Sequence, residues 1–464
     1  MFEFLKKKDL FNKDKVAELL QMSPQALEEF EKAYAANALE VSNSDNLFDI
    51  NAKMAAEQKE GLVIIPENVE KMIEEIVDDL VLKTYVYSTN TKYTYEQLPQ
   101  KTSECVITND DIKALPVELR PQLTGNMMKV DIETPSYLTL CDNYSRYLKD
   151  KDSAKGKQFY HMFRQGLDIL DLDPITYEII GTNPNSMGYW LPKLMDGVKY
   201  QTFFKVPETT IIKVPMTLLQ LTRQDYMELT KTTMEIVNRY CRRVFGLDLE
   251  KEYFIKTGTY SSKFDFRNAH VKGPKEVSEL GEYLLFIHFQ ALQMASSLST
   301  PCIYGVSTTN EWVVREFIKD KENNPWIYKG MPLHTEYRVF VDFDTLKVIG
   351  KNPYWDPDVM KQRFGHEEDA DSPHNIHDYI IYKAHEETLM KRYNENVDMV
   401  VAEIEKMIQT IDLHGQWSID VMQNGDDFWI IDMALAENSA FYDCVPKELR
   451  NPTEENWIPK LERS

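Results

Sequence analysis

The chain has 464 residues, of which 43% are hydrophobic and 28% charged, and its formal net charge is -22. This length exceeds what a single hydrophobic core usually supports, and the composition is that of a folded globular protein, not of a disordered or fibrous one. The acidic balance disfavours a broad binding surface for nucleic acid, although a local group of Lys and Arg could still hold a nucleotide.

Cysteine usage and hydropathy indicate the compartment. The five cysteines are scattered singly, which favours free thiols in a reducing environment. The early lysines are not followed by an apolar core, and no run reaches the roughly 18 apolar residues of a membrane span. We therefore expect a cytoplasmic protein that has no membrane contact.

The first 175 residues carry no readable chemistry. We expect a helical N-terminal segment at 1–60, with two helical stretches inside 15–37, and a mixed accessory region at 61–175. In that region, apolar periodicity predicts a helix at 67–82, and alternation predicts a strand within 83–98.

Helices and strands become regular from residue 176. The expected helices are 185–195, 222–246, 276–298 and 383–411. The expected strands are 176–181, 253–256, 312–318, 335–341, 346–350, 416–422 and 428–433, with two extended pieces between 205 and 215. Because the two kinds of element fall into groups, the prediction is an α+β fold with antiparallel sheets.

Four segments could carry chemistry, and the first is FIKTGTYSSKFDFRN at 254–268. Lys256 ends a predicted strand, and a loop of Gly, Thr and Ser leads to Lys263 and Asp265. Such a loop can close over phosphates, because its amides, hydroxyls and flanking lysines all attract anions. A solvated hairpin with surface lysines is the alternative.

The second segment is EWVVREFIKDKEN at 311–323, where the charged pair Arg315-Glu316 interrupts an apolar strand. Burying charge is costly unless it has a partner or a ligand. Arg315 could reach a phosphate, the Phe317–Ile318 backbone could meet an adenine edge, and Asp320 or Glu322 could reach a ribose. An edge strand with an exposed charged face is the alternative.

The third segment, at 334–355, predicts a hairpin in which Glu336, Arg338 and Phe340 share one face. An arginine beside an acid and an aromatic side chain could be aimed at an anion, or it could form a cross-strand ion pair.

The fourth segment, at 415–444, places Asp420 and Asp432 in two apolar strands that are joined by a short loop. A three-residue loop at 425–427 would set them opposite each other, whereas a two-residue turn at 424–425 would offset them. Opposed carboxylates on strands about 4.8 Å apart could share a cation.

In this order, the four segments resemble the ATP-grasp superfamily, and most closely its clade marked by two arginines and one lysine. That clade is similar to the ATP-grasp assembly factor of the eukaryotic translation initiator complex. The resemblance covers 176–443, and it implies two α+β subdomains, 176–305 and 306–443, that clamp MgATP. A tail at 444–464 follows.

The resemblance implies a role for each matching residue. Lys256 and Lys263 would bind phosphates, with Asp265 in the loop between the subdomains, and Lys256 and Arg338 would act in catalysis. The implied nucleotide-binding residues are Lys256, Lys263, Asp265, Arg315, Glu316, Phe317, Ile318, Glu322 and Arg338. The implied Mg²⁺ ligands are Asp420 and Asp432. Ala434 stands where the family usually has Asn, so Glu437 or Asn438 would supply the third ligand.

The resemblance also implies a reaction. An ATP-dependent ligase would phosphorylate a carboxylate and let an amine or thiol attack the acyl phosphate, with release of ADP. The carboxylate and amine substrates stay unknown, and a peptide or protein is among the candidates. One alternative is a MgATP-binding assembly protein. Another is a nucleotidyl-transferring RNA ligase with Lys256 as nucleophile, which the acidic balance disfavours.

Overall fold

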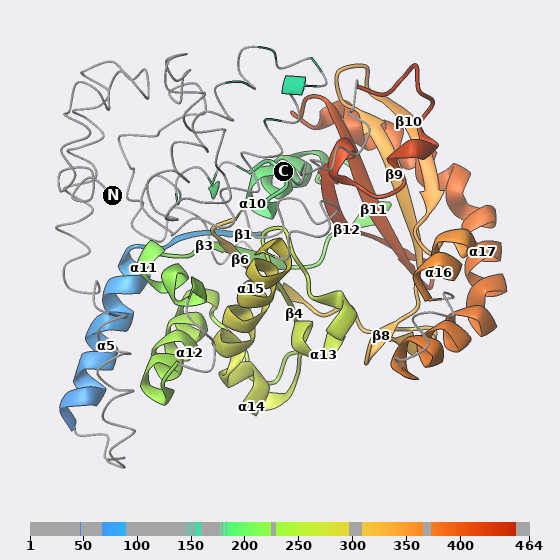
Figure 1. Ribbon diagram of the computed structural model, residues 1–464. Coiled ribbons are helices and arrows are strands. Elements are labelled where there is room, and N and C mark those ends of the chain that lie inside the picture. Colours follow the sequence, from blue (N-terminus) through green and yellow to red (C-terminus); the bar gives the residue numbers. More distant parts are fainter. Residues whose placement is uncertain are drawn as a thin grey trace, which may run out of the picture.

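Figure 1 shows the computed structural model. It describes residues 67–89, 183–223, 229–296, 309–364 and 373–451, together with single positions between 47 and 181. The helices expected within 15–37, the proposed tail beyond 451 and most of the accessory region lie outside these residues. The proposed segment boundaries therefore stay predictions.

The first sheet has the strand order β1-β3-β6-β4-β5, and every neighbouring pair is antiparallel. Its strands are β1 (Tyr85–Ser88), β3 (Thr209–Lys213), β4 (Tyr253–Thr257), β5 (His270–Val271) and β6 (Glu311–Glu316). The helices beside it are α5 (Glu67–Leu82), α11 (Met216–Leu219), α12 (Lys231–Phe245), α13 (Phe266–Ala269), α14 (Gly273–Ser278) and α15 (Leu280–Ser296), with the short turns η3 (Gln220–Arg223) and η5 (Lys263–Asp265).

A buried hydrogen bond ties this helical layer to the sheet. Trp312 of β6 donates from its indole nitrogen to Nδ1 of His288 in α15 at 3.1 Å. Side chains alternate along a strand. Trp312 and Val314 therefore face the helices, whereas Val313 and Arg315 face the second sheet.

The second sheet has the order β10-β9-β11-β12-β2, in which only β12 and β2 run parallel. Its strands are β2 (Phe204–Lys205), β9 (Thr335–Asp342), β10 (Lys347–Pro353), β11 (Gln416–Asn424) and β12 (Asp427–Leu435). The long helix α17 (Pro373–Met407) and the turn η8 (Ile408–Thr410) cover one face, where Val397, Val400 and Ile404 share a core with Val339 and Ile419. The opposite face is turned toward the first sheet.

Short elements join the two sheets. The ribbon β7 (Trp326–Ile327) with β8 (Met331–Pro332) and the helix α16 (Pro357–Phe364) pack near α17. Helix α10 (Met187–Val198) contacts both sheets, because Trp190 and Leu194 belong to the core that contains Val313 and Trp417. The turns η9 (Ala436–Asn438) and η10 (Tyr442–Cys444) follow β12.

The predicted α+β class with antiparallel sheets is confirmed. The helix expected at 67–82 is α5. The strand expected at 176–181 is wrong, because Tyr177 and Ile180 are helical. The helix expected at 222–246 begins later, at Lys231, because the side chain of Thr230 caps it by accepting a hydrogen bond from the Thr233 amide.

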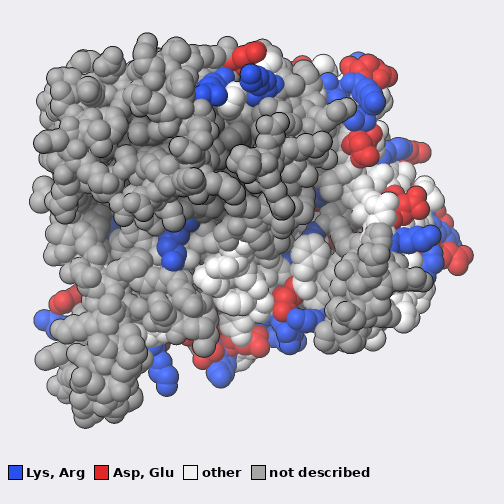
Figure 2. Space-filling model, viewed as in Figure 1, with Lys and Arg blue, Asp and Glu red and all other residues white. Residues whose placement is uncertain are grey.

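The helix expected at 276–298 is two helices. Gly273 and Pro274 start α14, and Glu279 leaves the helical conformation before α15 begins. No helix among the described residues is long and apolar enough to cross a membrane. On the described surface visible in Figure 2, Lys and Arg are interspersed with Asp and Glu, and no broad patch of one sign forms in that view.

A glycine substitution tests how closely α12 and α15 approach each other. Replacing Gly by Ala within a helix ordinarily stabilises a protein by about 0.5–1 kcal/mol. At Gly281 an added Cβ would lie 2.7 Å from the Val237 carbonyl oxygen and 3.0 Å from Asn238 Cα. Gly281→Ala should therefore lower the free energy of unfolding in urea by roughly 1–3 kcal/mol. An increase in that free energy would show that the two helices are not in this contact.

Candidate functional site

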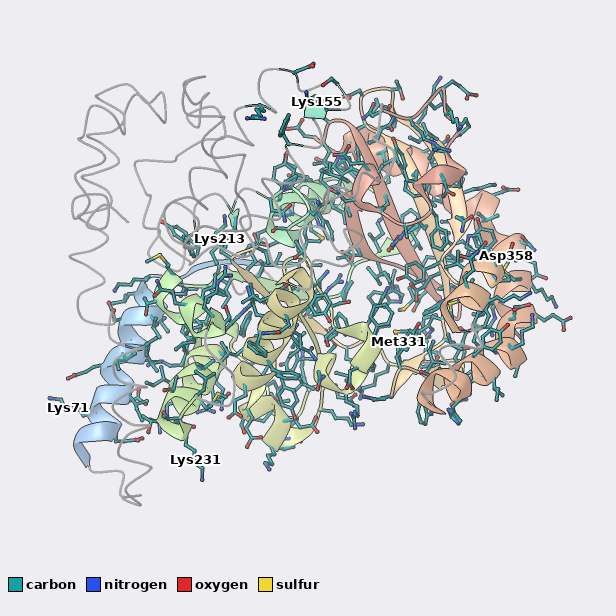
Figure 3. The ribbon with its side chains drawn as sticks, in the orientation of Figure 1. Lys71, Lys155, Lys213, Lys231, Met331 and Asp358 are labelled. Carbon is teal, nitrogen blue, oxygen red and sulfur yellow. The ribbon has the colours of Figure 1, made fainter. Side chains whose placement is uncertain are left out.

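A cavity lies between the two sheets and draws its lining from both. Its walls combine apolar and aromatic side chains with charged ones. The lining residues are Pro207, Phe254, Lys256, Ser261, Lys263, Phe266, Arg315, Glu316, Phe317, Ile318, Met331, Pro332, His334, Glu336, Tyr354, Trp355, Asp420, Met422, Ile431 and Asp432. Figure 3 labels Met331 of β8, which lies between α13 and the elements of the second sheet.

Strand alternation explains which side chains of the first sheet reach this cavity. Phe254 pairs with Arg315, and Lys256 pairs with Val313, across the β4–β6 ladder. Residues that pair directly share a face of the sheet. Phe254, Lys256 and Arg315 therefore project together toward the second sheet.

On the second sheet, three charged residues form a row across neighbouring strands. Asp420 of β11 pairs with Arg338 of β9 on one side and with Asp432 of β12 on the other. Their side chains therefore lie on one face, which is the face turned toward the first sheet.

A β-bulge produces this alignment of the two carboxylates. The β11–β12 turn has two residues, Gly425 and Asp426, because Asn424 pairs with Asp427. Uninterrupted pairing from that turn would offset Asp420 from Asp432 by one position. The register instead shifts between Asp420 and Val421, so that Ile431 is the extra residue on β12. Neither loop considered from the sequence alone has this geometry.

Each carboxylate is paired with a cation. Arg338 donates to Asp420 through two hydrogen bonds, from Nε at 2.8 Å and from Nη2 at 2.5 Å. Lys256 Nζ lies 3.3 Å and 3.5 Å from the two carboxylate oxygens of Asp432. Burial lowers the pKa of Arg338, but the negative charge of Asp420 and its hydrogen bonds outweigh this effect, so that the pKa lies above its ordinary value. Asp432 differs from the other three side chains because it is 45% exposed, whereas Lys256 is 3% exposed.

Arg315 is the most unusual cation of the site. Its Nε donates to the hydroxyl of Thr209 at 3.1 Å, and its Nη1 donates to the carbonyl oxygen of Ile431 at 2.5 Å. Its Nη2 is buried and has no hydrogen-bond partner among the described residues. Burial lowers the pKa of Arg315 to about 10, and the charge of Asp432 acts in the opposite direction. A buried guanidinium nitrogen without an acceptor is costly, and an anion in the cavity would satisfy it.

The segment after β6 connects the two halves of the fold: the first half is built around the first sheet and the second half around the second sheet. The Phe317 amide donates to the carbonyl of Glu252 in the first half at 3.1 Å. The buried side chain of Asn424 in β11 accepts from the Lys321 amide and donates to the Lys319 carbonyl, both at 2.9 Å. Ile318 lies between these attachments and lines the cavity.

Four expected site residues do not line the cavity. Arg338 contacts it only through Asp420 and through the ring of Tyr354. Asp265 pairs with Lys329 at 2.7 Å and with Arg267 at 3.2 Å. The other two are Asn438, which accepts from Asn185 at 2.8 Å in η9, and Glu322, which pairs with Arg392 at 3.0 Å.

Glu322 belongs to a polar cluster beside the cavity. Asp320, Glu322 and His334 bring their polar atoms within 4.8 Å of one another. The amide nitrogen of Asn324 lies 3.1–3.4 Å from an acceptor atom of each of the three. Arg392 contacts both Glu322 and the Asn324 oxygen. These contacts account for the cluster as a hydrogen-bond network, and His334 is its only member that lines the cavity.

Sequence reasoning missed most of the apolar and aromatic lining. Met331 and Pro332 come from the small β7–β8 ribbon, and Tyr354 and Trp355 follow β10. The aromatic pair at the end of the predicted hairpin was the one available signal. Aromatic residues are so frequent in cores that this signal alone could not assign them to a cavity.

Comparisons with known proteins add little to this geometry. No protein-family model matches the chain, and no curated protein matches it. Among solved structures, the chain is similar to C-terminally truncated Cdc123 from Schizosaccharomyces pombe, with a TM-score of 0.34 and 14% identity over 59% of this chain and 92% of that one. A second structure of Cdc123 from that organism has a TM-score of 0.34 and 13% identity, over 58% of this chain and 94% of that one. A likeness at this level fixes neither the fold nor the function of this chain.

Glu336 gives a pH test of the cavity. Burial raises its pKa from 4.5 to about 7, although Lys263 and Arg338 act to lower it. A carboxyl group with a raised pKa favours the folded state only while it is protonated, so stability should be lost as the pH rises through this window. Glu336→Gln removes the titration. The free energy of unfolding of the variant relative to wild type should increase by roughly 1–3 kcal/mol between pH 4.5 and 8.

Urea unfolding of the two proteins, measured in parallel at several pH values, gives this difference. The contributions of all other ionisable groups are common to both proteins and cancel. Equal pH profiles would contradict a buried, titrating Glu336.

Proposed function

We propose that this chain binds MgATP in the cavity between its two sheets, in the arrangement of an ATP-grasp protein. The observation that carries the proposal is the Nη2 of Arg315, which is buried and has no acceptor in the described part of the chain. Arg315 lines the cavity together with Lys256 and Lys263. Three cations in a cavity that also has apolar and aromatic walls suit a ligand with a phosphate chain and an aromatic base.

The base would lie against the segment after β6, beside the apolar side chains of the lining. The amides of Glu316 and Phe317 already donate to carbonyls of the first half. The Ile318 amide has no backbone acceptor among the described residues, so it is available to the ring nitrogen of an adenine. Phe254, Phe266 and Met331 supply the apolar walls.

The two aspartates fit a magnesium ion. Asp420 and Asp432 face the cavity on paired strands, and carboxylate oxygens are the ligands that Mg²⁺ prefers. When bound, the ion would neutralise charge on the phosphates. Asp432 is the more exposed of the two, and its present partner Lys256 could turn to a phosphate. Lys256 would then pair with a phosphate in place of Asp432, so that it would keep an anionic partner when MgATP binds.

As the ATP-grasp resemblance implies, we propose an ATP-dependent ligase that joins a carboxylate substrate to an amine or thiol and releases ADP and inorganic phosphate. In such a reaction the chain would contribute positioning and charge neutralisation. Lys256 and Arg315 would hold the phosphates, and Arg338 would keep the carboxylate of Asp420 oriented through its two hydrogen bonds.

One observation favours a second candidate, in which the protein binds MgATP without ligation and presents a surface to a protein partner. Ala434 offers no side-chain oxygen at the position of the third metal ligand, and Asn438 is occupied by Asn185. A ligase site would therefore lack, at these two positions, the third metal ligand that the resemblance implies.

Binding is tested by thermal unfolding with MgATP. At a nucleotide concentration 100-fold above Kd, binding should stabilise the wild-type protein by about 2.7 kcal/mol, and excess EDTA should remove most of this gain. Asp432→Asn should weaken MgATP binding roughly 10- to 100-fold, because it removes the exposed metal ligand.

The matched control is Asp427→Asn. Asp427 lies on the same strand and pairs with Lys205 at 2.6 Å and Lys321 at 2.5 Å, but it lies outside the cavity. It should leave MgATP binding unchanged. Equal binding by the Asp432→Asn and wild-type proteins would exclude this magnesium site.

Turnover separates the candidate functions. With MgATP and a mixture of amines and carboxylates, a ligase should form ADP and a product whose mass equals the two substrates less water. Mass spectrometry measures both. Nucleotide binding without ADP would favour the assembly protein, and AMP with an adenylate on Lys256 would favour nucleotidyl transfer.

A further inference from the structure

The ring of Tyr354 lies beside two cations, of which Lys263 lines the cavity and Arg338 does not. Tyr354 follows β10 directly, and its ring centroid lies 4.3 Å from Lys263 Nζ and 4.9 Å from the guanidinium carbon of Arg338. Both distances are within the range of cation–π attraction. The two cations come from different halves of the fold, since Lys263 belongs to η5 and Arg338 to β9.

The ring is firmly attached to the second half. The Tyr354 amide donates to the Glu336 carbonyl of β9 at 3.0 Å. Its ring meets Trp355 edge-on, with centroids 5.1 Å apart. Trp355 is buried, and its carbonyl accepts from the hydroxyl of Tyr382 in α17 at 3.0 Å. Tyr354 is therefore a fixed point, whereas Lys263 is carried by a loop.

That loop is anchored at its base. Ser262 takes the left-handed conformation, with φ 46°, and its hydroxyl donates to Gln290 of α15 at 2.8 Å. Lys263 comes next, with a long flexible side chain. Its ammonium group lies 5.8 Å from the ring centroid of the adjacent Phe264, and closer, at 4.3 Å, to that of Tyr354, which comes from the other half of the fold.

We propose that Tyr354 is a positioning residue that holds Lys263 of the first half at the cavity, where it can bind a phosphate. An aromatic face attracts an ammonium ion but carries no net charge. The ring therefore holds Lys263 without placing a further negative charge beside it. The contact also draws the loop toward the second half, beside the Asp265–Lys329 ion pair. The identification of the ligand as a phosphate rests on the proposed function.

The first experiment needs no nucleotide. A limiting amount of an amine-reactive reagent labels the folded protein, and mass spectrometry gives the labelling rate of each lysine. Tyr354→Leu should raise the rate at Lys263 about three- to tenfold, because the ammonium loses a stabilising contact. Tyr354→Phe keeps the ring and should leave that rate within about twofold of wild type. Lys406 of α17, which pairs with Glu403, provides the internal control, and its rate should not change.

The second experiment measures MgATP affinity in a double-mutant cycle. Tyr354→Leu should weaken MgATP binding by about three- to tenfold in the wild-type background. In a Lys263→Ala background the same substitution should have a smaller effect, since only the contact of the ring with Arg338 is then lost. A general structural disturbance would weaken binding equally in both backgrounds.

The outcomes separate this inference from the proposed function. Unchanged labelling of Lys263 in Tyr354→Leu, or equal losses of affinity in both backgrounds, would overturn the role of Tyr354. Wild-type protein that does not bind MgATP would overturn the proposed function, while the labelling rates would still decide whether Tyr354 positions Lys263. If Tyr354→Leu does not fold, Tyr354→Met replaces it in the same two measurements, because the methionine side chain adapts to the space but has no aromatic face.

Discussion

Two carboxylates placed opposite each other on paired strands repel unless positive charge is near, and the inner face of this fold is organised around that requirement. Asp420 and Asp432 belong to the second sheet, and their partners come from both halves of the protein. Arg338 reaches Asp420 from the next strand, whereas Lys256 reaches Asp432 from the first sheet. The second of these ion pairs therefore ties the two sheets together at the cavity. A ligand that carries both a cation and phosphates could exchange these partners without leaving any charge unpaired.

One extra residue in β12 makes this arrangement possible. The bulge at Ile431 brings Asp432 level with Asp420, and it also turns the Ile431 carbonyl toward Arg315 of the first sheet. A carbonyl within regular pairing would be engaged in the ladder, so the bulge frees the acceptor that Arg315 uses. The same irregularity thus aligns the acidic pair and anchors the buried arginine. The remaining nitrogen of that arginine is left for the cavity.

Local sequence pattern predicted the parts of the site that lie on regular strands. Arg315, Asp420 and Asp432 were recognisable because each is a charge within an apolar strand, and alternation assigned their faces. Nothing in the sequence FWIIDM indicates a β-bulge, so the register that sets Asp420 opposite Asp432 could not be predicted. Asp265 and Asn438 were assigned to the site by the resemblance, and local sequence could not correct this because their partners are distant in the chain: Lys329 is 64 residues from Asp265, and Asn185 is 253 residues from Asn438. The ring of Tyr354 was missed for a different reason, since a cation–π contact between segments leaves no spacing pattern in a sequence.

The connection after β6 joins the shape of the cavity to the relative position of the two sheets. Phe317 is hydrogen-bonded to Glu252 of the first half, and its ring stacks on His270 of β5 with centroids 3.7 Å apart. Two residues later Lys319 is held by Asn424 of the second half. A rotation of one sheet relative to the other must therefore be absorbed by the backbone between these two attachments, and that backbone is Ile318, which lines the cavity. A base bound against Ile318 would resist such a rotation, and a rotation would in turn weaken its contacts. Nucleotide binding and closure of the two sheets would then be reciprocally coupled through a single residue.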